Sequence, residues 1–354
     1  MKHIFLTAGL AFSTICTIAQ TGVIAKQNGA NSAFYYAPGQ DLAYAVQQAA
    51  PGDTLYLPGG ILPYNGITIN KRLTIIGAGY HANGVPVTQK TVIPSTFSLS
   101  FVVEASADGS SFHGIDFEEN IAFSTAVMNI DFVRCEFNDI SLDPFSTVGA
   151  QNISFRQCVF RDPLGIEQSE SIYVYNSVFE QGVYITNYGS ASQVQIKQCL
   201  FLNASLTNAQ VNGVEYENNV FVYNQNSGTI QVNCIGTLRN NVFVANAVLP
   251  VTITPLGVSS GNSSMTCSPA NAQFVNLPSL TTYVYNSDLQ LQSCADAFPG
   301  FGGYEVGVYG GPAGSTWKEN GIPFNPHWET LITPANTING VLPAVQIQGS
   351  AQTN

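Results

Sequence analysis

One apolar pattern recurs along the middle of this chain about every 21 residues. NIDFVRCEF, from Asn129, and NISFRQCVF, from Asn152, share Asn, Ile, Phe, Cys and Phe at the same places, while the residues between them differ. Aligned on the last Phe, six copies end at Phe137, Phe160, Phe179, Phe201, Phe221 and Phe243. A near-constant step of this length is typical of solenoids, in which each repeat stacks on the previous one.

Within each copy, apolar residues alternate with period two. Ile130 and Phe132 are one such pair, and Cys135 and Phe137 are another. An amphipathic helix would instead repeat every three or four residues. Two short strands joined by a bend explain both pairs, and copies stacked at about 4.8 Å would place each Phe above the last. The sequence therefore predicts an all-β parallel β-helix of roughly eleven or twelve coils.

The predicted bend between the two strands carries a column of amides. These amides stand just before the positions of Cys158, Ser177 and Cys199. Asn tolerates the left-handed backbone of a sharp bend, and stacked amides can bond one another from coil to coil. We therefore expect a structural amide column formed by Gln157, Asn176, Gln198, Asn218 and Asn240.

The two ends of the solenoid need covers. Before the repeats, Leu42, Ala45, Val46 and Ala49 would share one face of a short helix that ends at PG, and we expect this helix to cap the open coil. Cys267 and Cys294 are candidates for a disulfide.

The first residues, MKHIFLTAGLAFSTICTIAQ, have a basic start, an apolar run and a small residue at Ala19. This is typical of a secretory signal peptide over residues 1–19, and no later stretch reaches the roughly 18 apolar residues of a membrane span. We therefore expect a protein that is secreted or held at the cell surface. Its β-helix and N-terminal cap would cover 20–311, and 312–354 would form a C-terminal linker with capping strands.

Charge and cysteine spacing limit which partners and cofactors can be expected. The chain has a formal net charge of −11, which disfavours nucleic acid as a partner. No C-x-x-C spacing is present, so a zinc site is not expected. We expect a monomer whose partner is a polysaccharide or a surface protein.

The stretches PGDTLYLPGG and ITINKRLTIIGAG, followed by tandem Phe and Asn coils, resemble the pectate-lyase-like right-handed β-helix superfamily. The likeness spans roughly Ala33 to Gly311, and the stretch ending in GVYGGP resembles the closing coil of secreted bacterial members. The resemblance implies a right-handed β-helix. It does not decide function, because the superfamily includes lyases, hydrolases, adhesins and non-enzymes. The RxPxxR motif of pectate lyases is incomplete: RDPLGI starts at Arg161 and has Ile166 in place of the second Arg.

Polar residues follow the core Phe of consecutive coils and would gather into an acidic patch around Arg161. Such a patch could bind calcium, which takes six to eight oxygens, or supply catalytic groups. The catalytic candidates are Arg161, Asp139 and Asp162. The candidate metal ligands are Glu118, Glu119, Asp139, Asp162 and Glu180. Alternatively, these residues are only a solvated flank.

A second outward column contains Arg156, Tyr175 and Lys197, followed by Glu217 and Arg239. The last three alternate in sign and could pair as a ladder, and Tyr175 between two cations could stack on a sugar ring. The short turns of the repeats favour a noncatalytic protein that binds glycan or a protein along its flank. The alternative is a polysaccharide lyase or glycoside hydrolase that acts at the acidic patch.

Overall fold

A computed structural model gives the fold. It describes residues 23–35, 37, 39–63, 65–80, 89–95, 100–124, 127–142, 149–167, 169–186, 193–202, 206–209, 213–223, 230–231, 236–245, 251–252, 258–266, 274–284, 287–292, 300–312, 317–318, 327–332 and 346–350. The proposed signal peptide, Cys267 and Cys294 lie outside these residues.

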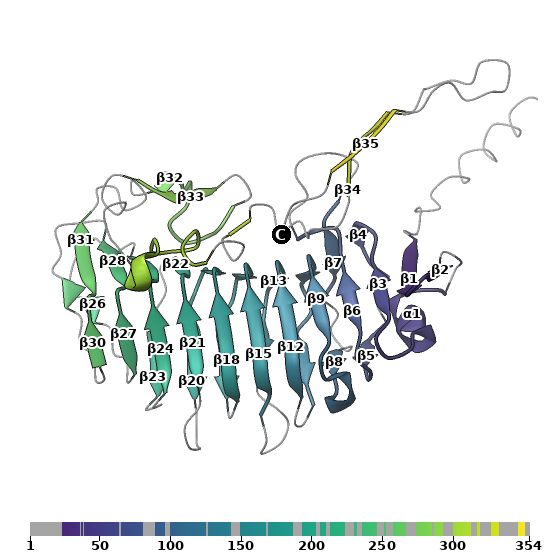
Figure 1. The fold of residues 1–354 in the computed structure, drawn as a ribbon, viewed down its shortest axis with the longest axis horizontal. Helices are drawn as coiled ribbons and strands as arrows, with labels where there is room; N and C mark the ends of the chain where they lie inside the picture. Colours follow the sequence, from purple (N-terminus) through teal and green to yellow (C-terminus); the bar gives the residue numbers. More distant parts are fainter. Residues whose placement is uncertain are drawn as a thin grey trace, which may run out of the picture.

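Three sheets of parallel strands wind around one core, so the protein is an all-β parallel β-helix (Figure 1). In spatial order, sheet A contains β2 (Asn31–Tyr35), β1 (Ile24–Asn28), β3 (Thr54–Tyr56), β6 (Thr74–Ile76), β9 (Ser111–His113), β12 (Met128–Val133), β15 (Gln151–Arg156), β18 (Glu170–Tyr175), β21 (Val194–Lys197), β24 (Val214–Glu217), β27 (Thr237–Arg239) and β30 (Val258–Ser260). β1 pairs antiparallel with both β2 and β3, and from β3 onward the strands are parallel.

Sheets B and C complete each coil. Sheet B contains β4 (Gly60–Ile61), β7 (Thr91–Ile93), β10 (Asp116–Phe117), β13 (Glu136–Phe137), β16 (Val159–Phe160), β19 (Val178–Phe179), β22 (Leu200–Leu202), β25 (Val220–Tyr223), β28 (Val242–Ala245) and β31 (Ser263–Thr266). Sheet C contains β5 (Ile67–Ile69), β8 (Phe101–Val103), β11 (Ile121–Phe123), β14 (Ile140–Ser141), β17 (Leu164–Glu167), β20 (Val183–Thr186) and β23 (Leu206–Ala209). The described residues give about seven full turns, fewer than the roughly eleven or twelve predicted.

Outside these sheets the described elements are short. They are α1 (Leu42–Gln48), η1 (Ala105–Ala107), η3 (Phe301–Gly303) and the strand pairs β26 (Ile230–Gln231) with β29 (Val251–Thr252), β32 (Phe274–Asn276) with β33 (Asp288–Leu291), and β34 (His327–Ile332) with β35 (Gln346–Ser350). Asp41 begins α1 by accepting a hydrogen bond from the Tyr44 amide at 2.9 Å. As predicted, Leu42, Ala45 and Val46 are buried, and they belong to the same apolar cluster as the coils.

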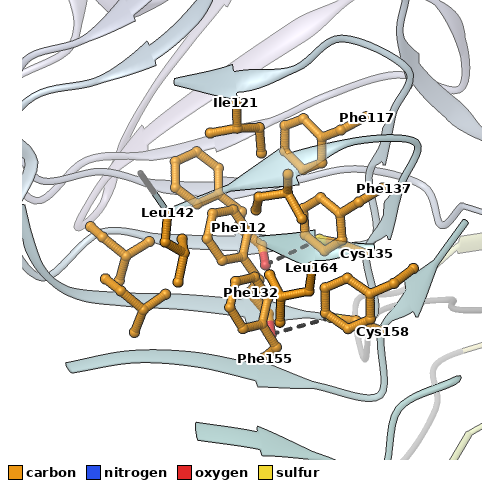
Figure 2. Packing of buried hydrophobic residues seen from close by; sticks show 14 of the residues in the cluster. Phe112, Phe117, Ile121, Phe132, Cys135, Phe137, Leu142, Phe155, Cys158 and Leu164 are labelled. Carbon is orange, nitrogen blue, oxygen red and sulfur yellow. Dashed lines mark hydrogen bonds between the residues drawn. The ribbon is translucent and has the colours of Figure 1, made fainter. Parts of the chain in front are cut away.

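The predicted file of phenylalanines is confirmed. Phe160, Phe179 and Phe201 are fully buried and stack with centroid distances of 4.6 and 4.5 Å. A second file from sheet A, which includes Phe132 and Phe155 at 5.1 Å, packs against the first (Figure 2). The alternation of period two in both strands of the repeat directs these rings inward.

The bend between sheets A and B has the predicted left-handed backbone, with φ of 48° at Asn176 and 56° at Asn218. The amide ladder, however, lies one residue later than predicted. Asn219 donates to Asn241 Oδ1 at 3.0 Å, and Asn241 donates to Asn262 Oδ1 at 2.9 Å. At the left-handed position the side chains of Asn176 and Asn218 instead bond to residues 301–310.

Described residues between 274 and 317 contribute to a second apolar cluster, on the outer face of sheet B. The outward residues of its strands are apolar, as at Val178, Leu200 and Val220, and they pack with Tyr283 and Trp317. A sheet that is apolar on both faces must be covered on both. Thus this region lies along the flank of the solenoid (Figure 1), whereas the resemblance had implied a closing coil at its end.

Candidate functional site

The three predicted binding residues are neighbours. Arg156, Tyr175 and Lys197 end β15, β18 and β21, and they occupy equivalent positions in the ladder of sheet A. Each follows a buried residue, so each side chain points outward. Glu217 and Arg239 continue the same column.

This column forms one wall of a groove. The facing wall comes from residues 300–312, which we call the flank segment. The groove has a volume of about 420 Å³, and we call it the flank groove; its lining residues are Arg156, Tyr175, Asn176, Lys197, Gln198, Glu217, Phe301, Gly302, Tyr304 and Pro312. The sequence predicted the first wall but not the second, because the two walls lie more than 60 residues apart in the chain.

Side chains from the bend hold the flank segment in place. The Phe301 amide donates to Asn218 Oδ1 at 2.6 Å, and Asn218 Nδ2 donates to the Phe301 carbonyl at 3.2 Å. Two coils before, Asn176 Nδ2 donates to the carbonyls of Val308 at 2.8 Å and Gly310 at 2.7 Å. The amides at the bend therefore position the second wall of the groove, a role that the sequence did not reveal.

The predicted charge ladder along the groove is confirmed and is denser than expected. Lys197 Nζ lies 2.9 Å from Glu215 and 3.6 Å from Glu217. Arg239 lies 3.1 Å from Glu217 and 3.6 Å from Glu215. Each cation thus contacts two carboxylates.

At the other end of the groove, Arg156 pairs with Asp131 at 3.5 Å. The sequence pattern did not single out Asp131 or Glu215 as members of this ladder. Glu215 stands two residues before Glu217, and Asp131 stands two residues before Val133, which pairs with Arg156; both therefore lie on the same outward face of sheet A as the column.

Aromatic rings lie on both walls of the groove. Tyr175 stacks beside Tyr173 at 6.3 Å, and its hydroxyl donates to Gln195 Oε1 at 3.0 Å. Burial and then the neighbouring Tyr173 raise the pKa of Tyr175 to about 12, so the phenol stays neutral at physiological pH. Phe301 and Tyr304 are 50 % and 42 % exposed, and both are accessible to a ligand.

The acidic patch has the predicted backbone register. The backbone amides of Arg161 and Glu180 donate hydrogen bonds to the carbonyls of Phe137 and Phe160, each in the preceding coil. Arg161 forms ion pairs with Glu180, at 3.6 Å, and with Glu136. Glu180 also accepts a hydrogen bond from the Tyr283 amide at 2.9 Å, which links it to the part of the chain that covers the outer face of sheet B. The predicted catalytic arginine is therefore engaged by two carboxylates.

Sequence reasoning missed the buried Glu136 and Asp116. Burial, and then the nearby Asp116, raise the pKa of Glu136 to about 7. The pKa of Asp116 is also raised, mainly by burial, although Lys90 forms an ion pair with it. Both carboxylates precede a core Phe on the outer face of sheet B, where alternation alone predicts exposure.

The other proposed metal ligands lie along the same turn. Asp139 and Asp162 are exposed, and partial desolvation together with Asp162 raises the pKa of Asp139. Asp162 accepts a hydrogen bond from Gln181, and Glu119 accepts one from the Asn120 amide. Within the part of the chain that the structure describes, no three His, Cys, Asp or Glu side chains, Glu118 included, converge as a metal site. Calcium binding and catalysis at this patch stay predictions.

Comparisons with protein-family models, curated proteins and solved structures found no match to this chain. None of the described helices is long and apolar enough to cross a membrane.

Proposed function

We propose that the chain is an exported, noncatalytic β-helix protein of the pectate-lyase-like type that binds glycan in the flank groove. The observation that carries this proposal is the convergence of Tyr175, Phe301 and Tyr304 with paired charged groups in one groove. Export rests on the signal-like residues 1–19.

The groove combines the two kinds of group that a sugar needs. The apolar face of a pyranose ring packs on an aromatic ring, and hydroxyls exchange hydrogen bonds with fixed polar groups around it. Phe301 carries the Arg239 guanidinium at 4.5 Å from its ring centroid, which orders that ring at the groove wall. The walls are thus held by contacts within the protein before any ligand arrives, which limits the entropy lost on binding.

Binding is favoured over catalysis because the proposed catalytic residues belong to a different part of the surface. Arg161 lies between Glu136 and Glu180, which does not favour its acting as a base. The alternative, a lyase or hydrolase at the acidic patch, predicts turnover of uronic-acid polysaccharides in the presence of calcium. Absorbance from unsaturated products that disappears in Arg161→Ala would support a lyase instead of our proposal.

A glycan array probed with the purified protein tests the proposal. We expect a subset of glycans to bind the wild type and to be lost in Tyr175→Ala. Tyr184→Ala is the matched control, because Tyr184 is 46 % exposed on sheet C, outside the groove. The absence of binding across a broad array, or equal loss in both variants, would contradict glycan binding at this groove.

A further inference from the structure

We propose that the flank groove takes a neutral glycan and discriminates against uronic-acid glycans. This inference rests on the proposed function and specifies its ligand. It follows from how the charged groups of the groove are paired.

The cations and carboxylates of the groove balance one another. Three cations line or flank the groove, and three carboxylates pair with them. Taken pair by pair, these groups are Arg156 with Asp131, Lys197 with Glu215 and Glu217, and Arg239 with the same two glutamates. The charges of the six groups along the groove therefore sum to zero.

An anionic sugar would meet both signs at once. A carboxylate near Lys197 would also approach Glu215 and Glu217, which lie 2.9 and 3.6 Å from that ammonium. To bind the cation it would have to displace an existing partner, and like charges brought together oppose binding. The net charge of −11 on the whole chain acts in the same direction.

A neutral sugar keeps these pairs. A hydroxyl both donates and accepts, so adjacent hydroxyls can bond to a carboxylate and to its cation together without separating them. The Arg156 side chain is half exposed, which leaves guanidinium N–H groups available beside Asp131. The neutral phenol of Tyr175 offers its ring as a platform without adding charge.

The direction of the column indicates an oligosaccharide. Arg156, Tyr175, Lys197 and Glu217 come from four consecutive strands, so the column spans about 14 Å at roughly 4.8 Å per strand. A glycan chain would lie across the strands, along the solenoid axis. We therefore expect affinity to rise from monosaccharide to oligosaccharide.

Paired ligands test the inference. Isothermal titration calorimetry at low salt would compare oligosaccharides of equal length that differ in one group per ring, hydroxymethyl in hexoses and carboxylate in hexuronic acids. Galacto- with galacturono-oligosaccharides, and manno- with mannurono-oligosaccharides, are such pairs. We expect at least about tenfold tighter binding of the neutral member.

Glu215→Gln removes one carboxylate from the groove and should narrow this difference several-fold by strengthening uronate binding. The control is Glu170→Gln, which makes the same charge change at an exposed position at the start of β18 and should leave the ratio unchanged. Thermal melting checks that both variants are folded.

The outcomes separate the two proposals. Uronates that bind as tightly as neutral sugars, and lose binding in Tyr175→Ala, would overturn the selectivity and leave glycan binding intact. A ratio that Glu215→Gln does not change would overturn the charge argument. If neither ligand class binds at the groove, the proposed function fails, and the inference fails with it.

Discussion

Asn218→Gly should release the flank segment without unfolding the β-helix. Glycine adopts the φ of 56° that this position requires, so the bend itself is not strained. The substitution removes two hydrogen bonds between the Asn218 side chain and Phe301. It keeps the bond from the Gly307 amide to the main-chain carbonyl of residue 218.

The size of the effect follows from these two bonds. At about 1 kcal/mol net for each, docking of residues 300–312 weakens by about 2 kcal/mol. If the backbone amides of residues 300–312 exchange when this segment detaches locally, their hydrogen exchange accelerates about 30-fold. Peptide-level exchange measured by mass spectrometry reports this directly, and glycan affinity should fall with it.

Asn152→Gly is the matched control. Asn152 also has a left-handed backbone, with φ of 53°, but its side chain bonds to Asn129 in the neighbouring coil. We expect no change in exchange over 300–312. Equal exchange of this segment in wild type and Asn218→Gly, or equal acceleration in both variants, would refute the claim that Asn218 holds the groove wall.

Three further predictions concern the core and the acidic patch. Phe179→Ala should lower the free energy of unfolding by about 3–5 kcal/mol in denaturant titrations, because Phe179 is fully buried between two stacked rings; a loss below about 1 kcal/mol would contradict the single file. Burial raises the pKa of Glu136 from its ordinary 4.5 to about 7, so the folded state keeps a proton that the unfolded chain has lost. Its contribution to stability is therefore present below pH 4.5 and is lost as the pH rises to 7, so the melting temperature should fall over this range. Glu136→Gln should make the melting temperature depend less on pH over the same range, and an unchanged dependence would refute this assignment. Calcium should raise the melting temperature of the wild type but not of Asp139→Asn, and an equal rise in both would exclude Asp139 as a ligand.

Much of the interior could be predicted from the sequence because two periods fix it. The step of about 21 residues sets which residues stack, and alternation sets which point inward. Phe160 and Phe179 therefore lie where they were expected. The same register predicts that Arg156, Tyr175 and Lys197 are neighbours, as the structure shows.

What could not be predicted depends on contacts between distant parts of the chain. Glu136 looks exposed by alternation, yet it is buried on the outer face of sheet B, which a later region of the chain covers. One local signal of this cover was present. The outward residues Val178, Leu200 and Val220 are apolar, and a solvated sheet face would not repeat such residues. They show that the flank needs a cover, but not that the cover also forms a groove.

A crystal structure of the protein with a bound neutral oligosaccharide is the most direct test of the central claim. We predict sugar rings in the flank groove, on Tyr175 and Phe301, with hydroxyls bonded to Lys197 and its paired glutamates. Sugar bound instead at the turn of Asp139 and Asp162, with the groove empty, would contradict the account.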